Sequence, residues 1–306
     1  MKSFVGLVLM GLLAMNGQLQ AESSITVATS IKPVSMVVKA IGGDKVKIRQ
    51  IVSNSASPHD FALRPSDLKK ILKADLVVWV GESLEPFLEK PIANSQHANT
   101  AIEWMTLVEG DEHKEDQGDE LHNKGQHEGH HHDGLDPHVW LDMDNALLLA
   151  QAVEQALIAL APENALYFQQ NRATFDQTLA LLDKKNSQQL AVLSELNYVV
   201  FHDAYGYFED HYGLVHLANI SLSPERKPGA KKVVAIRGLM QANQVACIFS
   251  EVQFNPDIVD SLVEGTDVKV VELDPLGSGI ELNEAAYPAF MRKMSHDFLA
   301  CQNNAI

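Results

Sequence analysis

Cysteine, basic residues and long apolar runs are all scarce in this chain. Its 306 residues include 2 Cys, and 24 Lys plus Arg stand against 40 Asp plus Glu, which gives a formal net charge of −16. Nucleic-acid binding relies on a positive surface, so this deficit of basic residues argues against DNA or RNA as a partner. No segment reaches the roughly 20 consecutive apolar residues of a membrane-spanning helix. Only 12 Pro, together with 46% apolar residues, indicate a globular chain rather than a disordered one.

The first residues are typical of a secretory signal peptide. Lys2 precedes an apolar run from Phe4 to Leu13, and the segment closes on the small residue Ala21. We expect a signal peptide at residues 1–21 and therefore an exported, soluble protein. An uncleaved anchor ranks lower because the run is too short to span a bilayer comfortably. The lack of cysteine near the expected cleavage site argues against a lipid anchor.

The two cysteines are Cys247 and Cys301. In an oxidising compartment two cysteines usually form a disulfide, so export favours pairing over two buried free thiols. Their separation does not fit a C-x-x-C redox or zinc motif.

Strand-like and helix-like segments alternate along the chain, which predicts an α/β protein with parallel sheets. Strands are expected at residues 25–29, 46–52, 75–80, 105–108, 198–201, 214–220, 245–249 and 268–273. Apolar residues at helical spacing, from Phe168 to Leu182, predict a helix that extends to about residue 193. A helix of about thirty residues would be roughly 45 Å long, which exceeds the width of one small domain.

We therefore predict two α/β lobes joined by one long rigid helix. Each lobe is expected to hold a small, mostly parallel sheet flanked by helices. The predicted boundaries are residues 22–160 for the first lobe, 161–193 for the connecting helix and 194–306 for the second lobe.

Chemically versatile side chains follow several predicted strands. His59 comes after the second strand, His138 precedes the long helices, His202 ends the first strand of the second lobe, and Asp274 follows the last strand. Ligands of open parallel sheets bind beyond the carboxyl ends of the strands, so we expect these four side chains at a cleft between the lobes. A single histidine after a strand is more often a surface or capping residue. Three histidines and one aspartate at such positions together favour a binding site.

Three imidazoles and one carboxylate suit Zn²⁺, which takes nitrogen and oxygen ligands in a tetrahedral arrangement. Each histidine must be neutral to bind the ion, and a neighbouring carbonyl or carboxylate would fix its tautomer. Asp60 and Asp203 are candidates for that orienting role, and the alternative for each is a solvated loop charge.

Six motifs together resemble the metal-binding solute-binding proteins of bacterial ABC transporters, and among these the periplasmic zinc-binding proteins of zinc importers. They are S-P-H-D-F at 57–61, R-P-S-D at 64–67, A-D-L-V-V at 74–78, D-P-H-V-W at 136–140, F-H-D-A-Y at 201–205 and E-L-D-P-L-G at 272–277. The resemblance covers essentially the whole chain after the expected signal peptide. It implies two α/β lobes with metal at their interface, His59, His138 and His202 as ligands, and Asp274 in or near the fourth position.

The resemblance also implies a function. A protein of this kind would capture Zn²⁺ with high affinity in the periplasm and deliver it to the membrane permease of a zinc ABC transporter, as a monomer and without enzymatic activity. Manganese members usually carry Glu at the third ligand position, so His202 favours zinc. Some zinc members carry Glu directly before the first ligand histidine, where this chain has Pro58; this leaves Asp274 or a water as the fourth ligand. The Cys247–Cys301 pair also resembles a disulfide of zinc members.

The composition changes abruptly between Glu109 and Asp136, where almost nothing is apolar. Carboxylates alternate there with the histidines His113, His122, His127, His130, His131 and His132. No core can be built from such a segment, so we expect a mobile surface loop at residues 109–136. We interpret it as a low-affinity zinc collector helped by His211; the alternative is a solvated acidic tract without a defined role.

Two other functions remain open. An exported zinc hydrolase would keep an open metal position for water, with Asp274 or Glu251 as the base. The chain has no H-E-x-x-H motif or other catalytic signature, which counts against this alternative. A surface adhesin is suggested by family analogy alone, and the missing lipid anchor argues against it.

Overall fold

The computed structural model describes residues 24–115, 136–221, 229–243 and 245–302, except for the side chains of 111–115 and 243. The expected signal peptide at residues 1–21 lies outside this part of the chain, as does most of the histidine-rich segment. No helix within the described ranges is both long and apolar enough to cross a membrane.

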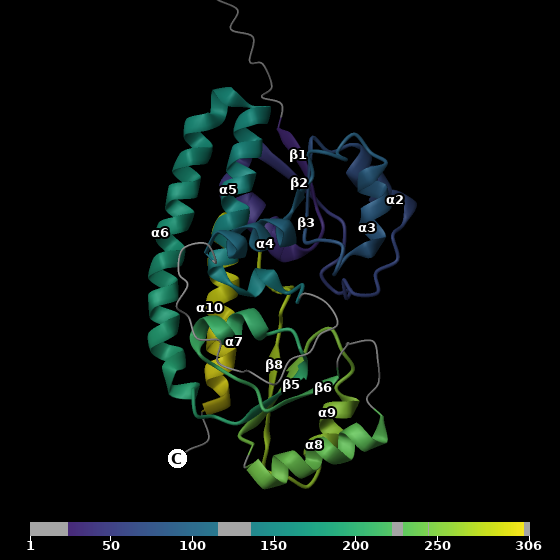
Figure 1. The fold of residues 1–306 in the computed structure, drawn as a ribbon, viewed down its shortest axis with the longest axis vertical. Coiled ribbons are helices and arrows are strands. Elements are labelled where there is room, and N and C mark those ends of the chain that lie inside the picture. Colours follow the sequence, from purple (N-terminus) through teal and green to yellow (C-terminus); the bar gives the residue numbers. More distant parts are fainter. Residues whose placement is uncertain (1–23, 116–135, 222–228, 244, 303–306) are drawn as a thin grey trace, which may run out of the picture.

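Two four-stranded parallel sheets form the centres of two lobes (Figure 1). The first has the order β2-β1-β3-β4 and contains β1 (Ile25–Thr29), β2 (Val46–Gln50), β3 (Leu76–Trp79) and β4 (Ile102–Glu103). The second has the order β6-β5-β7-β8 and contains β5 (Tyr198–His202), β6 (Ala218–Ser221), β7 (Cys247–Glu251) and β8 (Lys269–Leu273). In each sheet the second strand is added on one side of the first strand and the later strands on the other side. The point where the strand order changes side is where open parallel sheets bind ligands.

Helices cover both sheets and connect them. The first lobe contains α1 (Lys32–Gly42), α2 (Pro65–Leu72), α3 (Pro86–Ala93), α4 (Trp104–Glu115) and α5 (Met143–Leu160). The second contains α7 (Gly206–Tyr212), α8 (Ala230–Asn243), α9 (Asp257–Val263) and α10 (Ala286–Leu299). Between them runs α6 (Ala165–Leu190), with short 3₁₀ turns at Pro162–Asn164 and Ala191–Leu193. Its 26 residues measure about 39 Å, and Figure 1 shows it alongside both lobes. The predicted fold class is confirmed.

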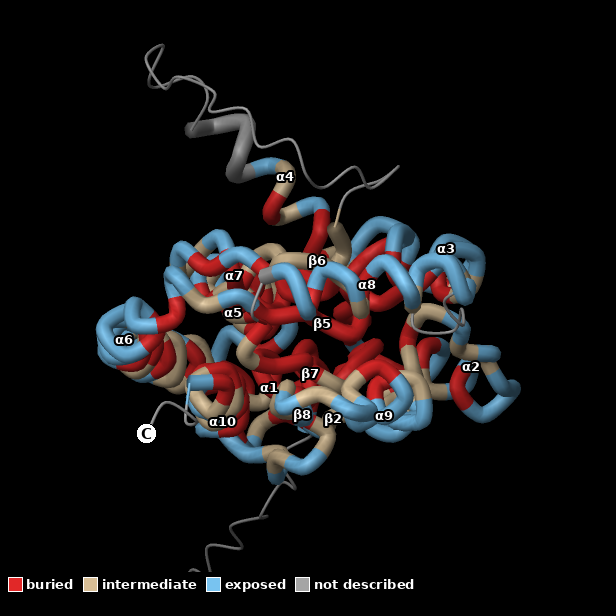
Figure 2. The backbone as a smooth tube through the Cα atoms, turned by 90° about the horizontal axis from the view of Figure 1, so that it is seen from below, coloured by how far each residue is buried: buried red, intermediate tan, exposed pale blue. Residues whose placement is uncertain are grey.

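One hydrophobic core continues from lobe to lobe. Buried side chains of the first sheet, of α1, α5 and α6, and of the second sheet and α10 belong to a single cluster. Figure 2 shows these buried positions running through the middle of the molecule. Helix α10 packs on both α6 and α1, so it adds a second connection beside the long helix. A wide hinge opening would expose this shared core to water, which favours local loop movements instead.

The structure differs from two of the predicted strands. The apolar residues at 105–108 belong to α4, and the strand lies just before them, at β4; Met105 and Val108 are buried on the inner side of the helix. A segment of four residues with three apolar members does not distinguish a strand from one helical turn. The strand expected at 214–220 begins later, with β6 at Ala218.

The expected loop at 109–136 is also wrong in its first residues, because α4 continues to Glu115. A polar composition excludes a packed core but not a helix, and Glu and Lys are good helix formers. Residues 116–135 of this segment lie outside the described residues.

The predicted disulfide is present. Cys247 at the start of β7 is bonded to Cys301 just after α10, with 5.6 Å between their Cα atoms. Both cysteines are buried. The bond ties the last helix, which lies against both lobes, to the second sheet.

Removing this disulfide should lower stability. The bond closes a loop of 54 residues, for which loss of unfolded-state entropy gives about 4 kcal/mol as an upper value. We expect the Cys247→Ala, Cys301→Ala double variant to unfold at lower denaturant concentration than the oxidised protein. Reduction of the wild type should produce a similar loss, and an unchanged midpoint in both experiments would contradict the expectation.

His211 in α7 joins elements of the two lobes by ion pairs. Its Nδ1 lies 3.0 Å from Asp142 Oδ1, just before α5, and its Nε2 lies 2.8 Å from Asp183 Oδ1 in α6. The hydrogen bond to Asp142, assisted by Asp183 and opposed by burial, raises the pKa of His211 to about 9. His211 is therefore an imidazolium at neutral pH.

The stability that His211 contributes should depend on pH. Because its pKa is higher in the folded than in the unfolded protein, the contribution is complete below about pH 6.5 and is lost as pH rises through about 9. Denaturant unfolding at pH 6.5 should show His211→Asn less stable than wild type by on the order of 1–2 kcal/mol, less than the full pKa shift corresponds to because solvent screens the partly exposed ion pairs, and the difference should shrink by pH 9.5. His296→Asn, at an exposed histidine, is the control. A pH-independent difference would contradict the assignment.

Candidate metal centre

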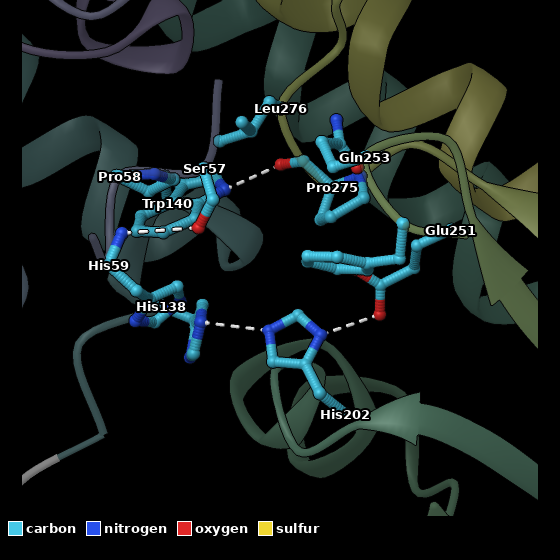
Figure 3. A pocket seen from close by; sticks show the side chains of 11 residues that line it. Ser57, Pro58, His59, His138, Trp140, His202, Glu251, Gln253, Pro275 and Leu276 are labelled. Atoms are coloured by element: carbon cyan, nitrogen blue, oxygen red, sulfur yellow. Dashed lines mark hydrogen bonds and ion pairs between the residues drawn. The ribbon is translucent and has the colours of Figure 1, made fainter. Parts of the chain in front are cut away.

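The structure brings together three of the four predicted ligands. His59 lies in the loop after β2, His138 directly before the 3₁₀ turn Val139–Leu141, and His202 at the last position of β5. Their ring centroids are 5.3 to 5.8 Å apart, and one ring nitrogen of each lies within 4.8 Å of the others. Figure 3 shows the three rings converging between the lobes. They form a candidate metal site.

Asp274 is not part of this group. Its Oδ1 accepts hydrogen bonds from Gln253 Nε2 at 3.0 Å and from the backbone N–H of Leu276 at 3.3 Å. Its Oδ2 accepts from Ser278 Oγ at 2.6 Å and from the backbone N–H of Gly279 at 3.4 Å. The direct metal binding expected of Asp274 from the sequence is not tested by these contacts.

His202 is held by a carboxylate on the neighbouring strand. Its Nδ1 lies 2.6 Å from Glu251 Oε1, and both side chains are buried. The parallel register pairs Val200 with Phe249, so two positions further along His202 stands opposite Glu251 at the ends of β5 and β7. Because an ionised carboxylate only accepts, Nδ1 carries the hydrogen and Nε2 is left with a lone pair.

His138 is held in the same way by Asp136. Its Nδ1 lies 2.6 Å from Asp136 Oδ1, and its backbone N–H donates to the same oxygen at 3.1 Å. The side chain of Asp136 therefore closes a turn over Pro137 and fixes the imidazole ring in one step. As in His202, the lone pair of His138 is left on Nε2.

The two Nε2 atoms of His138 and His202 face each other at 3.4 Å. Two acceptors at this distance repel unless a proton or a metal ion lies between them. Two nitrogens bound to one tetrahedral zinc, each ~2.0–2.1 Å from it, would be roughly 3.3–3.4 Å apart. A carboxylate behind each metal-facing imidazole is also the usual support of protein zinc sites.

The cavity beside the rings is small. Its volume is about 20 Å³, which holds one water-sized particle. Apart from the histidines, its walls are largely apolar and include Trp140, Phe254, Pro275 and Leu276. Gln253 also lines it, and its Oε1 is buried with no hydrogen-bonding partner among the described residues. The site is therefore sized for an ion and one small ligand.

Two contacts join the lobes beside the cavity. Trp140 Nε1 donates to Pro275 O at 2.7 Å, and the hydroxyl of Tyr287 in α10 lies 2.9 Å from Trp140 O. They fix the segment that carries His138 against the second lobe, so the relative position of His138 and His202 does not depend on α6 alone.

The carboxylates that orient the rings differ from those considered from the sequence. Asp60 is exposed, whereas Asp203 accepts a hydrogen bond from Asn219 at 3.3 Å and lies 3.9 Å from His216 Nε2. The orienting pair is Asp136 and Glu251. The D-x-H spacing gives a signal for the first, but Glu251 emerges only from the pairing of β5 with β7.

The histidines predicted for the auxiliary site are not tested by these contacts. His113 belongs to α4, but its side chain is not described; His122, His127, His130, His131 and His132 lie outside the described residues. His211 forms a second group of possible ligand atoms with Asp142 and Asp144. There its ion pairs account for the carboxylates without a metal.

Comparison with known proteins identifies the family of the chain. The family model described as ZnuA, zinc-uptake complex component A, periplasmic, matches residues 27–301. The chain belongs to this family. The names of the family and of its relatives describe periplasmic components of zinc uptake systems.

Relatives match along most of their length. The high-affinity zinc uptake system protein ZnuA of Yersinia pestis is 36% identical over 291 residues, which cover 91% of this chain and 92% of the relative. That of Haemophilus influenzae is 31% identical over 319 residues and covers 90% and 92%.

Solved structures share the fold. A crystal structure of ZnuA covers 89% of this chain and 98% of its own, with a TM-score of 0.71 and 24% identity. The periplasmic zinc-binding protein TroA of Treponema pallidum covers 91% and 99%, with a TM-score of 0.74 and 20% identity.

Loss of either orienting carboxylate should weaken metal binding. Asp136→Asn and Glu251→Gln keep the size of the side chain but remove the charge behind the imidazole. We expect each to raise the zinc dissociation constant about 10- to 100-fold in chelator competition. Asp60→Asn, at an exposed carboxylate beside His59, is the matched control and should change it little. Equal effects of all three variants would contradict the specific role of the pair.

Proposed function

We propose that the protein captures Zn²⁺ in the periplasm and delivers it to the membrane permease of an ABC transporter. The observation that carries the proposal is the convergence of two carboxylate-backed imidazoles, one from each lobe, at 3.4 Å between their Nε2 atoms. Membership of the zinc-uptake family and the names of its relatives support the same cargo.

His59, His138 and His202 are the proposed protein ligands of zinc. A three-imidazole set favours Zn²⁺ over Mn²⁺, which prefers carboxylate, carbonyl and water oxygens. Zinc is normally four-coordinate, so one position remains. A water is the proposed fourth ligand, because Gln253 lines the cavity and its Oε1 is a buried acceptor without a protein partner among the described residues.

The site supports a carrier better than a hydrolase. Of the two candidate bases, Glu251 is bound to His202, and both oxygens of Asp274 accept hydrogen bonds. A cavity of about 20 Å³ leaves no room for an organic substrate beside the metal. We therefore propose that the protein is not an enzyme.

The remaining features of the proposal concern the whole chain. We propose an exported monomer with a signal peptide at residues 1–21, lobes at 22–160 and 194–306, and a connecting helix at 161–193. The net charge of −16 supports a partner other than nucleic acid. The histidines between His113 and His132 are proposed as a low-affinity zinc collector that feeds or buffers the cleft site.

Chelator competition tests this function directly. Metal-free full-length mature protein should bind one Zn²⁺ tightly and Mn²⁺ much more weakly. Replacing His113, His122, His127, His130, His131 and His132 by Asn should leave the tight site intact and remove only weak binding. Loss of the tight site in that variant would place it in the histidine-rich segment and contradict the proposal.

Single substitutions locate the tight site. His59→Ala, His138→Ala and His202→Ala should each weaken zinc binding by at least about tenfold, because each removes a direct ligand where even loss of a supporting group costs 10- to 100-fold. His296→Ala, at an exposed histidine, should bind like wild type. Near-normal affinity of any of the three cleft variants would remove that residue from the proposed set.

A further inference from the structure

The carboxylate of Asp274 lies in the loop that borders the three-histidine cavity, yet it is occupied by other contacts. An ionised carboxylate offers about four lone-pair directions. The four donors on Asp274 are the side chains of Gln253 and Ser278 and the backbone N–H groups of Leu276 and Gly279. A metal bond from Asp274 would therefore break at least one hydrogen bond in a residue that is only 9% exposed.

The first lobe supplies a cation to this loop. Lys32 at the start of α1 is buried, and its Nζ donates to Ser278 O at 2.8 Å. Burial lowers the pKa of Lys32, and the negative charge of Asp274 opposes that shift. The ammonium group thus compensates the charge of Asp274 across the lobe boundary. It donates its hydrogen bond to the backbone of Ser278, the residue whose hydroxyl donates to Asp274.

The loop is also fixed by packing. Gly277 has a positive φ of 59°, and a Cβ there would lie 2.8 Å from Met36 of α1 and from Phe290 of α10. Two residues before it, the carbonyl oxygen of Pro275 accepts the hydrogen bond from Trp140 Nε1. The backbone that carries Asp274 is therefore held by elements of both lobes.

We propose that Lys32, Gln253 and Ser278 form a clasp that withholds the Asp274 carboxylate from the metal, so that the cleft presents three imidazoles and one open position and discriminates against Mn²⁺. This inference rests on the proposed zinc-binding function and assigns the source of its selectivity. A carboxylate added to three imidazoles favours a harder ion such as Mn²⁺ and adds a ligand that must leave before release.

The clasp has room to open. A hollow of about 190 Å³ borders it and is lined by Asn54 and Ser55 of the first lobe and by Val252, Gln253 and Ser278 of the second. Removing one clasp contact can therefore free the Asp274 side chain without disrupting the shared core.

The first test is the structure of wild-type protein crystallised with zinc. The expected result is an ion bound by His59, His138 and His202, with Asp274 still hydrogen-bonded to Gln253 and Ser278. A zinc–oxygen bond to Asp274, about 2.0–2.2 Å long, would overturn the inference while leaving zinc capture intact. Zinc bound away from the three histidines would instead contradict the proposed function.

The second test breaks the clasp. Lys32→Met keeps the apolar stem and removes the ammonium group, and Ser278→Ala removes one donor to Asp274. Competition titrations with Zn²⁺ and Mn²⁺ should show the Mn²⁺ affinity of Lys32→Met raised about tenfold relative to that of Zn²⁺, with slower zinc release to a chelator. Ser278→Ala, which removes a direct donor from Asp274 Oδ2, should change both in the same direction.

A double variant and a control separate this effect from general damage. Adding Asp274→Asn to Lys32→Met should abolish the gain in Mn²⁺ affinity, because the uncompensated negative charge of Asp274 is its source. Lys39→Met, on the same helix but paired with Asp44 and Glu284, should bind both metals like wild type. An unchanged metal preference in folded Lys32→Met and Ser278→Ala would overturn the inference. If Lys32→Met does not fold, Ser278→Ala and the zinc-bound structure decide.

Discussion

The shared hydrophobic core is the constraint on which the metal centre depends. Helices α1, α6 and α10 pack against one another and against elements of both sheets, so the carboxyl edges of the sheets are held facing each other. Without that packing, the lobes that carry His138 and His202 would move independently. The 3.4 Å distance between their Nε2 atoms would then not be maintained. The same core opposes wide hinge motion, which favours movement of the loops that border the cavity over separation of the lobes.

The polar groups around the cavity divide into two kinds with opposite effects on a cation. Asp136 and Glu251 lie behind imidazole rings, where their charge strengthens the ligand nitrogens while an Nδ1 hydrogen separates each carboxylate from the ion. Asp274 carries the same charge in the loop that borders the cavity, but its lone pairs are taken by four donors and Lys32 compensates its charge. In the proposed site, this arrangement supplies negative potential that attracts Zn²⁺ and leaves only nitrogen atoms as protein ligands.

The three histidines of the candidate site could be predicted from the sequence. His59, His138 and His202 each follow a recognisable strand or turn signal, because the ends of parallel strands must open toward one edge of the sheet. The partners were harder to predict. Glu251 acquires its role from the register between β5 and β7, and Lys32 from the approach of α1 to a loop that is 246 residues away in sequence. Neither of these contacts is visible in a local sequence pattern.

The sequence by itself determined the α/β alternation, the long helix, the disulfide pair and the three histidines, because hydrophobic periodicity and residue chemistry are local properties. Tertiary structure decided that Met105 and Val108 pack on a helix, that Asp136 and Glu251 support the imidazoles, and that Asp274 is surrounded by hydrogen-bond donors. These outcomes depend on which surfaces meet when the lobes share one core. The free energy of that packing, rather than any local preference, selects them.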